Sequence, residues 1–296
     1  MSYEDREGHL TGLLLVSASA LLFSVAGVLT KMIAAEAWTI AAWRGLLGGL
    51  LVLAYVAWDR RRKTSKTTSG AVFRLGWRGW FLATVGSLAS LAFIYAFKLT
   101  FIANVAVIYA TAPFMAAGLA WLLLREVVRV RTLVAAGFCV LGVTIVVAGG
   151  LSTGNLIGDG VALLMTLGNA LYMVLVRLFR ETPVVLAGGV SALQLFAVSW
   201  FFADPLAVTK QDALLLSIFG LSFAAALVLW TEGTKRVTAA ESGLFGAMET
   251  PFAILLAWLL LAEWPPLASF LGGGLVLAAV FAHAGRDVFD ARRTSS

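Results

Sequence analysis

Charged residues are scarce in this sequence. Only 13% of its 296 residues are charged, whereas 60% are hydrophobic. A soluble domain of this length does not need so much apolar surface, so the composition excludes an ordinary soluble protein and indicates a membrane protein. Cysteine occurs once, as Cys139, which excludes an intramolecular disulfide. We expect Cys139 to be a buried packing residue.

Motifs for catalysis and cofactor binding are also lacking. The only histidines are His9 and His283, and there is no His-Glu-x-x-His, Cys-x-x-Cys or Walker-type phosphate loop. We therefore expect no metal, no other cofactor and no direct ATP hydrolysis. Residues 150–154 match a nucleophile-elbow pattern, but no strand precedes them and both histidines are predicted at the opposite membrane face. The protein is predicted not to be an enzyme.

Long apolar runs are what the sequence has instead. A helix needs roughly 20 apolar residues to cross a hydrocarbon layer of about 30 Å. The predicted spans are residues 10–31, 38–58, 79–98, 103–124, 131–150, 156–176, 185–203, 212–231, 238–261 and 267–285. The alternating pattern of barrel strands is absent, so the predicted fold is an all-α integral membrane protein with ten transmembrane helices.

Positive charge is distributed unevenly between the two sides of these spans. Eighteen Lys and Arg residues lie on the side of both termini, against three on the other side, Lys31, Lys98 and Lys210. The positive-inside rule therefore places both termini in the cytoplasm. The predicted cytoplasmic segments include residues 1–9, the basic loop 59–78 and the tail 286–296. The basic run 60–63 lies at a membrane boundary without interleaved aromatics, so we expect a lipid bilayer and no nucleic acid as its partner.

Two stretches of the sequence are nearly the same. Residues 120–126 read Ala-Trp-Leu-Leu-Leu-Arg-Glu, and residues 257–263, which lie 137 positions later, read Ala-Trp-Leu-Leu-Leu-Ala-Glu. At the same offset Pro113 matches Pro251 with a slip of one residue. The acids that end the two stretches fall at opposite membrane edges, where we interpret them as boundary markers.

The repeat extends through both halves of the chain. Residues 21–31 resemble residues 167–177 at an offset of 146. Each half, residues 10–150 and 151–285, then contains five predicted spans. An odd number of spans gives the halves opposite orientations, which is the inverted repeat of many secondary transporters.

The chain has ten predicted spans in two halves of five, and the fourth helix of each half carries a proline followed by Ala-Trp-Leu-Leu-Leu-x-Glu. In these features the chain resembles members of the drug/metabolite transporter superfamily. The resemblance is to its EamA-type branch, over about residues 10–285. The chain further resembles the bacterial aromatic amino acid exporters of this branch (the YddG type). The resemblance implies a basket of ten helices in the bacterial inner membrane. Helices one, three, four, six, eight and nine would line its central cavity.

The two matched prolines are the first candidate site residues. Pro113 and Pro251 lie about ten and thirteen residues into the fourth and ninth spans, near the membrane midplane at ~1.5 Å per residue. Proline cannot donate to the carbonyl four residues back, so we expect free carbonyls at Tyr109 and Ala247 and a kink in both helices. These kinks would be hinges that also hold substrate, or simple packing kinks.

Glu249 is the acid deepest within a predicted span. A buried carboxylate is costly, so we expect it to face a water-filled cavity or a partner. It would receive a substrate ammonium, carry a proton, or pair with Arg44, which lies at a similar depth. Arg44 would alternatively bind a substrate carboxylate. Glu241 is the second acid on which proton coupling would depend.

The remaining candidates are polar residues on helices that the family places around its cavity. Each alone is more often a contact between helices than a ligand, but together they suit an apolar, aromatic pocket for an organic solute. They are Ser24, Tyr95, Asn104, Tyr109, Thr111, Asn169 and Tyr172.

These features together predict a carrier that exports amino acids, aromatic ones prominently, by alternating access. The alternatives are an efflux carrier for drugs or other small metabolites and a facilitative, channel-like uniporter. Glycines 45 and 49 and the run 272–274 favour close helix packing. We expect that packing within a monomer rather than in a dimer, because the fused halves already supply the two-fold partner.

Overall fold

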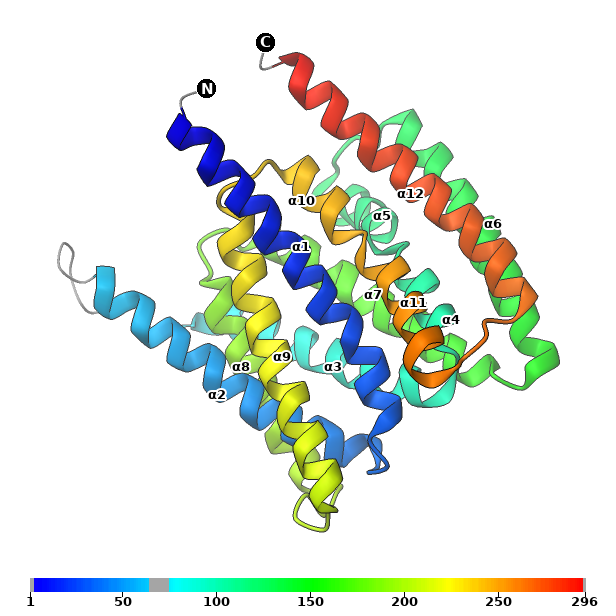
Figure 1. Ribbon diagram of the computed structural model, residues 1–296. Helices are drawn as coiled ribbons and strands as arrows, with labels where there is room; N and C mark the ends of the chain where they lie inside the picture. Colours follow the sequence, from blue (N-terminus) through cyan, green and yellow to red (C-terminus); the bar gives the residue numbers. More distant parts are fainter. Residues whose placement is uncertain (1–2, 64–74, 295–296) are drawn as a thin grey trace.

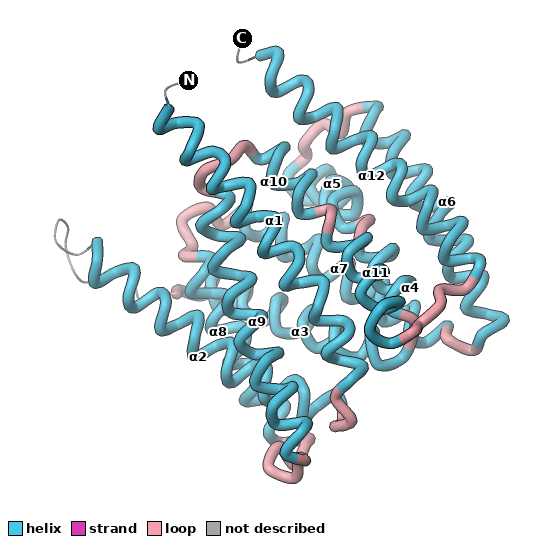
Figure 2. Tube along the Cα trace, viewed as in Figure 1, coloured by secondary structure: helices cyan, strands magenta, loops and turns pink. Residues whose placement is uncertain are grey.

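The computed structural model describes residues 3–63 and 75–294, which are almost entirely helical and contain no strand (Figures 1 and 2). Residues 64–74 of the predicted basic loop lie outside the described residues. The helices are α1 (Tyr3–Met32), α2 (Ala37–Lys63), α3 (Gly76–Leu99), α4 (Ile102–Tyr109), α5 (Ala112–Leu124), α6 (Val130–Thr153), α7 (Leu156–Leu178), α8 (Val184–Trp200), α9 (Lys210–Thr234), α10 (Ala239–Gly246), α11 (Glu249–Leu261) and α12 (Leu267–Thr294).

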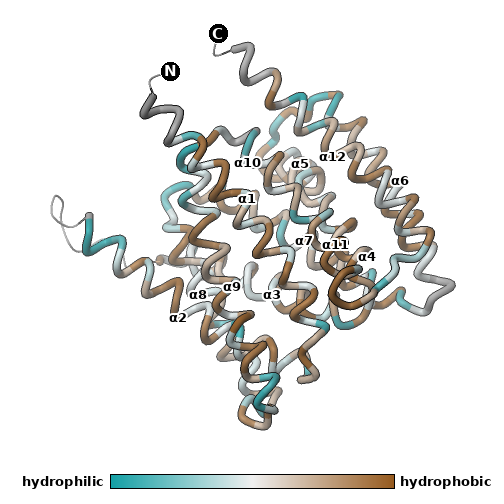
Figure 3. Tube along the Cα trace, in the orientation of Figure 1, coloured by the Kyte–Doolittle hydropathy of each residue, from teal (hydrophilic) through white to brown (hydrophobic). Residues whose placement is uncertain are grey.

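Most of the helices are long enough to span a membrane. Among the described residues, 9 helical stretches are long and apolar enough to cross a bilayer, with α4–α5 and α10–α11 each forming one stretch. The remaining predicted span, residues 185–203, corresponds to α8, a shorter apolar helix of 17 residues, so the count of ten stays a prediction. Large apolar side chains are exposed on helices such as α5 and α6, and Figure 3 shows that hydrophobic residues predominate along α6. Exposed apolar surface of this extent suits contact with lipid.

The helices pack in matching pairs. In the two predicted halves α1 corresponds to α7, α2 to α8, α3 to α9 and α5 to α11. The contact between α1 and α9 matches that between α7 and α3, and the contact between α2 and α9 matches that between α8 and α3. The contact between α1 and α11 likewise matches that between α7 and α5. Helices α2 and α8, and α6 and α12, pack on each other, the latter pair along one edge (Figure 1). Exchanging the two predicted halves converts each pairing into its match. The pairings therefore favour the predicted two-fold relation between the halves.

Both glycine motifs bring helices of this one chain close together. A Cβ atom at Gly45 would lie 2.5 Å from the carbonyl oxygen of Ala192 on α8, and one at Gly49 would lie 2.9 Å from the Leu193 side chain. Gly272 on α12 meets the backbone of α6 at Gly142 in the same way. The predicted close packing within the chain is confirmed.

The repeated Leu-rich stretches end in the same turn. Arg125 and Ala262 follow α5 and α11 in the left-handed conformation, with φ of 54° and 50°. The N–H groups of Glu126 and Glu263 then donate to carbonyls inside the preceding helices, at 3.4 and 3.2 Å. This turn directs both acids back toward the helix bundle.

Each of these acids binds the first helix of the other half. Glu263 accepts hydrogen bonds from Lys31 Nζ at 2.5 Å and from the Ile102 N–H at 2.6 Å. Glu126 accepts two from Arg177, at 2.6 and 2.8 Å. The Glu263 side chain is 12% exposed and that of Glu126 is 42% exposed. The interpretation of the acids as boundary markers alone is therefore incomplete, because both also join the two halves.

The different burial of these matched ion pairs predicts different contributions to stability. We expect Glu263→Gln to lower the free energy of unfolding by about 1–3 kcal/mol, because Lys31 loses its charged partner in a shielded site. Glu126→Gln, the matched control on an exposed pair, should cost less than about 1 kcal/mol. Thermal unfolding of the purified protein in detergent measures both. Equal losses would contradict the argument from burial.

Candidate functional site

Two helices are interrupted at equivalent positions. The first break, at residues 110–111, separates α4 from α5, and the second, at residues 247–248, separates α10 from α11. At both, the backbone hydrogen bonding shifts to the third residue back. Thr111 N–H donates to Ile108 O at 3.1 Å, and Met248 N–H donates to Phe245 O at 3.2 Å. The structure thus contains the two predicted interruptions, 137 residues apart.

The prolines lie just beyond these breaks, in the first turns of α5 and α11. Proline is tolerated there because helix-initial residues need no intrahelical donor. The expectation of a free carbonyl at Ala247 is wrong, because this carbonyl accepts from the Thr250 N–H at 3.4 Å. The two breaks are 137 residues apart, whereas Pro113 and Pro251 are 138 residues apart. Proline alone therefore does not determine where the helices break.

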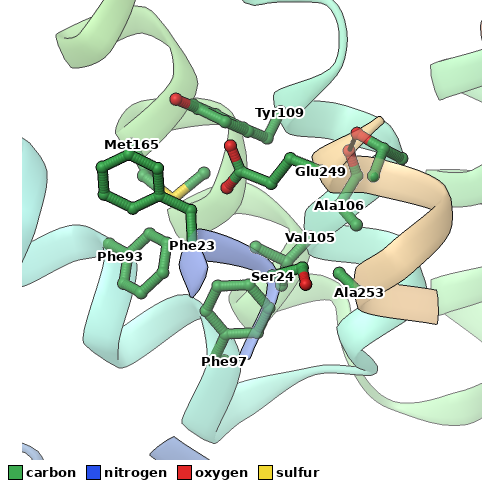
Figure 4. A pocket seen from close by; sticks show the side chains of 11 residues that line it. Phe23, Ser24, Phe93, Phe97, Val105, Ala106, Tyr109, Met165, Glu249 and Ala253 are labelled. Atoms are coloured by element: carbon green, nitrogen blue, oxygen red, sulfur yellow. Dashed lines mark hydrogen bonds between the residues drawn. The ribbon is translucent and has the colours of Figure 1, made fainter. Parts of the chain in front are cut away.

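A small cavity lies beside the breaks, lined by residues on both sides of them. Its free volume is about 10 Å³, which is space for about one water molecule. Five helices line it, namely α1, α3, α4, α7 and α11 (Figure 4). The lining residues are Phe23, Ser24, Phe93, Phe97, Val105, Ala106, Tyr109, Met165, Glu249, Thr250 and Ala253. Thr250 Oγ1 also donates to the Ala106 carbonyl at 3.3 Å and so connects α11 to α4.

Glu249 is the acidic residue of this cavity. Its carboxyl group points into the cavity beside the Tyr109 ring (Figure 4). Among the described residues no hydrogen bond or ion pair to its side chain is found, and its surroundings are mostly aromatic and aliphatic. An unpaired carboxylate is costly in such surroundings. Glu249 is therefore suited to take up a proton or a cationic group of a solute.

Arg44 does not supply that partner. It lies buried in α2, where its guanidinium donates to Ser90 Oγ and contacts three phenylalanine rings. The alternative that Glu249 pairs with Arg44 is therefore wrong.

Three of the residues predicted to line a substrate cavity, Ser24, Tyr109 and Glu249, line this small cavity. Tyr95 instead lines a separate, more open pocket of about 350 Å³ at the turn between α1 and α2, together with Glu36 and Lys98. Its ring stands edge-on to Trp38, with 5.8 Å between the ring centroids.

Asn104 belongs to a buried polar cluster away from the cavity lining. Its amide donates to Asp159 Oδ1 at 2.9 Å and its carbonyl oxygen accepts from Ser269. Thr100 Oγ1 donates to the same Asp159 oxygen at 2.7 Å. These bonds join α4, α7 and α12 at one end of the bundle, which is a structural role.

The other predicted polar residues bond locally or pack within the helix bundle. Thr111 Oγ1 donates to Ile108 O at 2.6 Å, and Asn169 Nδ2 donates to Met165 O at 3.0 Å. Tyr172 packs among apolar residues of α3, α7 and α8. Glu241 completes a capping box with Thr238 at the start of α10. Its Oε1 lies 3.1 Å from His9 Nε2, so Glu241 stands apart from Glu249.

The aromatic lining is what sequence reasoning missed. Phe23, Phe93, Phe97 and Met165 lie in apolar spans, where nothing distinguishes a cavity-facing residue from one facing lipid or a neighbouring helix. Thr250 had a usable signal, because it stands between Glu249 and Pro251. Within the described residues no three His, Cys, Asp or Glu side chains gather as metal ligands would.

A polytopic helical protein with a cavity beside two broken helices resembles membrane transporters, whose binding sites lie between interrupted helices. The model of the EamA-like transporter family matches residues 10–148 and 156–283. The chain therefore belongs to the EamA-like transporter family of the drug/metabolite transporter superfamily, and it is a multi-pass membrane transporter.

Comparison with solved structures gives the same fold. One of them, titled only as the crystal structure of a protein, matches with a TM-score of 0.65 and 20% sequence identity, covering 97% of this chain and 100% of its own. At this identity the likeness shows the fold alone. A search of curated proteins finds no match.

Hinge function at the breaks predicts unequal effects of the two prolines. Pro113→Ala adds an N–H that can bond the Tyr109 carbonyl, so we expect equal or slightly higher stability, by up to about 1 kcal/mol. The maximal transport rate should fall roughly 3- to 10-fold as the hinge stiffens. Pro251→Ala should have the smaller effect, because the Ala247 carbonyl already has a partner.

Transport by the purified protein in liposomes measures these rates. Pro183→Ala, at the start of α8, controls for proline loss outside the breaks. Unchanged rates in all three variants would show that the prolines are only packing residues.

Proposed function

We propose that the protein is a secondary transporter that exports amino acids, aromatic ones prominently, by alternating access through the cavity between the helix breaks. The observation that carries this proposal is Glu249, a carboxyl group without a partner among the described residues, facing an aromatic cavity. The ammonium group of an amino acid would complete it, and the phenylalanines of α1 and α3 would pack on an aromatic side chain.

Alternating access is supported by the matched pairings of the helices and by the equivalent breaks. The family model is also matched over two separate stretches, as expected if residues 10–150 and 151–285 are repeated halves. The cavity has room for only about one water molecule. A carrier must therefore open it to admit an amino acid. The distribution of basic residues supports cytoplasmic termini. A location in the bacterial inner membrane rests on the resemblance to bacterial exporters.

Efflux of cationic amphipathic metabolites or drugs is the second candidate function. It is favoured by the same acid among aromatic rings, since this arrangement also binds an organic cation that has no carboxylate. A facilitative uniporter would use the same cavity without coupling to a proton gradient.

Reconstitution of the purified protein in liposomes tests these functions. The solutes are radiolabelled phenylalanine, tyrosine, tryptophan, alanine, lysine and a hydrophobic organic cation, each with and without a pH gradient. We expect saturable uptake and counterflow, strongest for the aromatic amino acids. Transport of the organic cation alone would favour the second function, and uptake without saturation or counterflow would exclude a carrier.

Glu249 should determine both affinity and any proton coupling. We expect Glu249→Gln to raise the KM for phenylalanine about 10- to 100-fold through loss of a charge-assisted hydrogen bond. If Glu249 carries the proton, the dependence of transport on the pH gradient should also disappear. Glu241→Gln is the matched control, because Gln preserves a capping box and the residue stands outside the cavity. If Glu249→Gln keeps full transport with unchanged pH dependence, Glu249 neither binds the substrate ammonium nor carries the proton.

A further inference from the structure

Arg44 is a buried cation without an acidic partner. The residue is 8% exposed, and its guanidinium donates to Ser90 Oγ while Nε has no hydrogen-bond partner. The rings of Phe93, Phe219 and Phe223 lie 5.3, 5.3 and 4.4 Å from its Cζ atom. Among the described residues no carboxylate forms an ion pair with it.

The surrounding rings compensate this charge only in part. Contacts between a cation and a ring are each worth about 0.5–2 kcal/mol. They provide no acceptor for the N–H groups, however, and a guanidinium carries five of them in a planar fork. Ser90 accepts from one nitrogen. The unfilled fork has the geometry that binds a carboxylate through two parallel hydrogen bonds.

Phe93 places this cation next to the cavity. The same ring that contacts Arg44 lines the cavity that holds Glu249 (Figure 4). Ser90 and Phe93 are three residues apart on α3, so one helix supplies both the partner of Arg44 and the partition. A cationic and an acidic side chain, neither with an ion-pair partner among the described residues, therefore lie near the same aromatic side chain.

We propose that Arg44 is the anion subsite of the transporter and binds the carboxylate of the carried solute once the Phe93 side chain turns aside. This inference rests on the proposed function and specifies its substrate class, a small organic acid that also bears a cationic group for Glu249. Ser90 is a positioning residue that holds the guanidinium toward Phe93. The rival explanation is that Arg44 only packs among the three rings.

A pair of solutes that differ only in the carboxylate separates these explanations. Uptake of radiolabelled L-phenylalanine and of phenethylamine is measured in liposomes containing the full-length protein. We expect Arg44→Gln to raise the KM for phenylalanine about 10- to 100-fold, the range for a lost charge-assisted hydrogen bond, and to leave the KM for phenethylamine unchanged. Retained phenethylamine transport also shows that the variant is folded.

Two milder variants keep the test decisive if Arg44→Gln cannot be purified. Arg44→Lys keeps the charge without the fork, and Ser90→Ala removes only the positioning bond. Both should raise the KM for phenylalanine roughly 3- to 10-fold and spare phenethylamine. Lys210→Gln, which removes an exposed charge at the start of α9, is the control and should alter neither KM.

The outcomes also separate this proposal from the proposed function. If the Arg44 variants impair both solutes equally, or neither, Arg44 is a packing residue and the anion subsite is wrong, while the transporter remains. If the wild-type protein carries neither solute, the export of aromatic amino acids fails, and the anion subsite fails with it.

Discussion

A hydrocarbon layer offers no water to backbone N–H and C=O groups, so a chain that crosses it must pair those groups within the protein. Continuous helices meet this requirement everywhere except at a break. Here the breaks meet it locally, by the shift to third-residue hydrogen bonds at Thr111 and Met248 and by the bond from Thr250 to the Ala106 carbonyl. These solutions allow α4 and α11 to bring Tyr109 and Glu249 to the cavity while much of the nearby backbone stays bonded.

Charged side chains, like backbone groups, need partners where water is absent. The charged residues at the ends of α1 and α7 have ionic partners, and two deeper in the bundle have none in the described part of the chain. Lys31 and Arg177, at the ends of α1 and α7, each have an acid from the other half. Arg44 and Glu249, deeper in the bundle, have no ion-pair partner among the described residues. Paired charges hold the two halves together near the membrane faces. The unpaired side chains deeper in the bundle are the groups that we propose a solute would complete.

Much of the fold could be predicted from this sequence, because apolar length, basic loops and the 137-residue repeat are all properties of the chain read along its length. The breaks could be predicted for the same reason, from Pro113 and Pro251. The cavity lining could not, because it depends on which way each side chain faces. Asn104 and Phe97 are both buried, yet only Phe97 lines the cavity, while Asn104 bonds to Asp159. That difference depends on how each helix is rotated about its axis, and composition and spacing say little about this rotation.

The left-handed residues after α5 and α11 show how local geometry directs a distant contact. An alanine or arginine in this conformation costs about 1–2 kcal/mol relative to a right-handed one, and glycine would relieve that cost. Without the sharp turn at Ala262, however, the chain would continue away from the bundle, and the Glu263 carboxylate would not be directed toward Ile102. The strained backbone at one residue thus directs the next side chain, and its cost accompanies a hydrogen bond between residues 161 positions apart in the sequence.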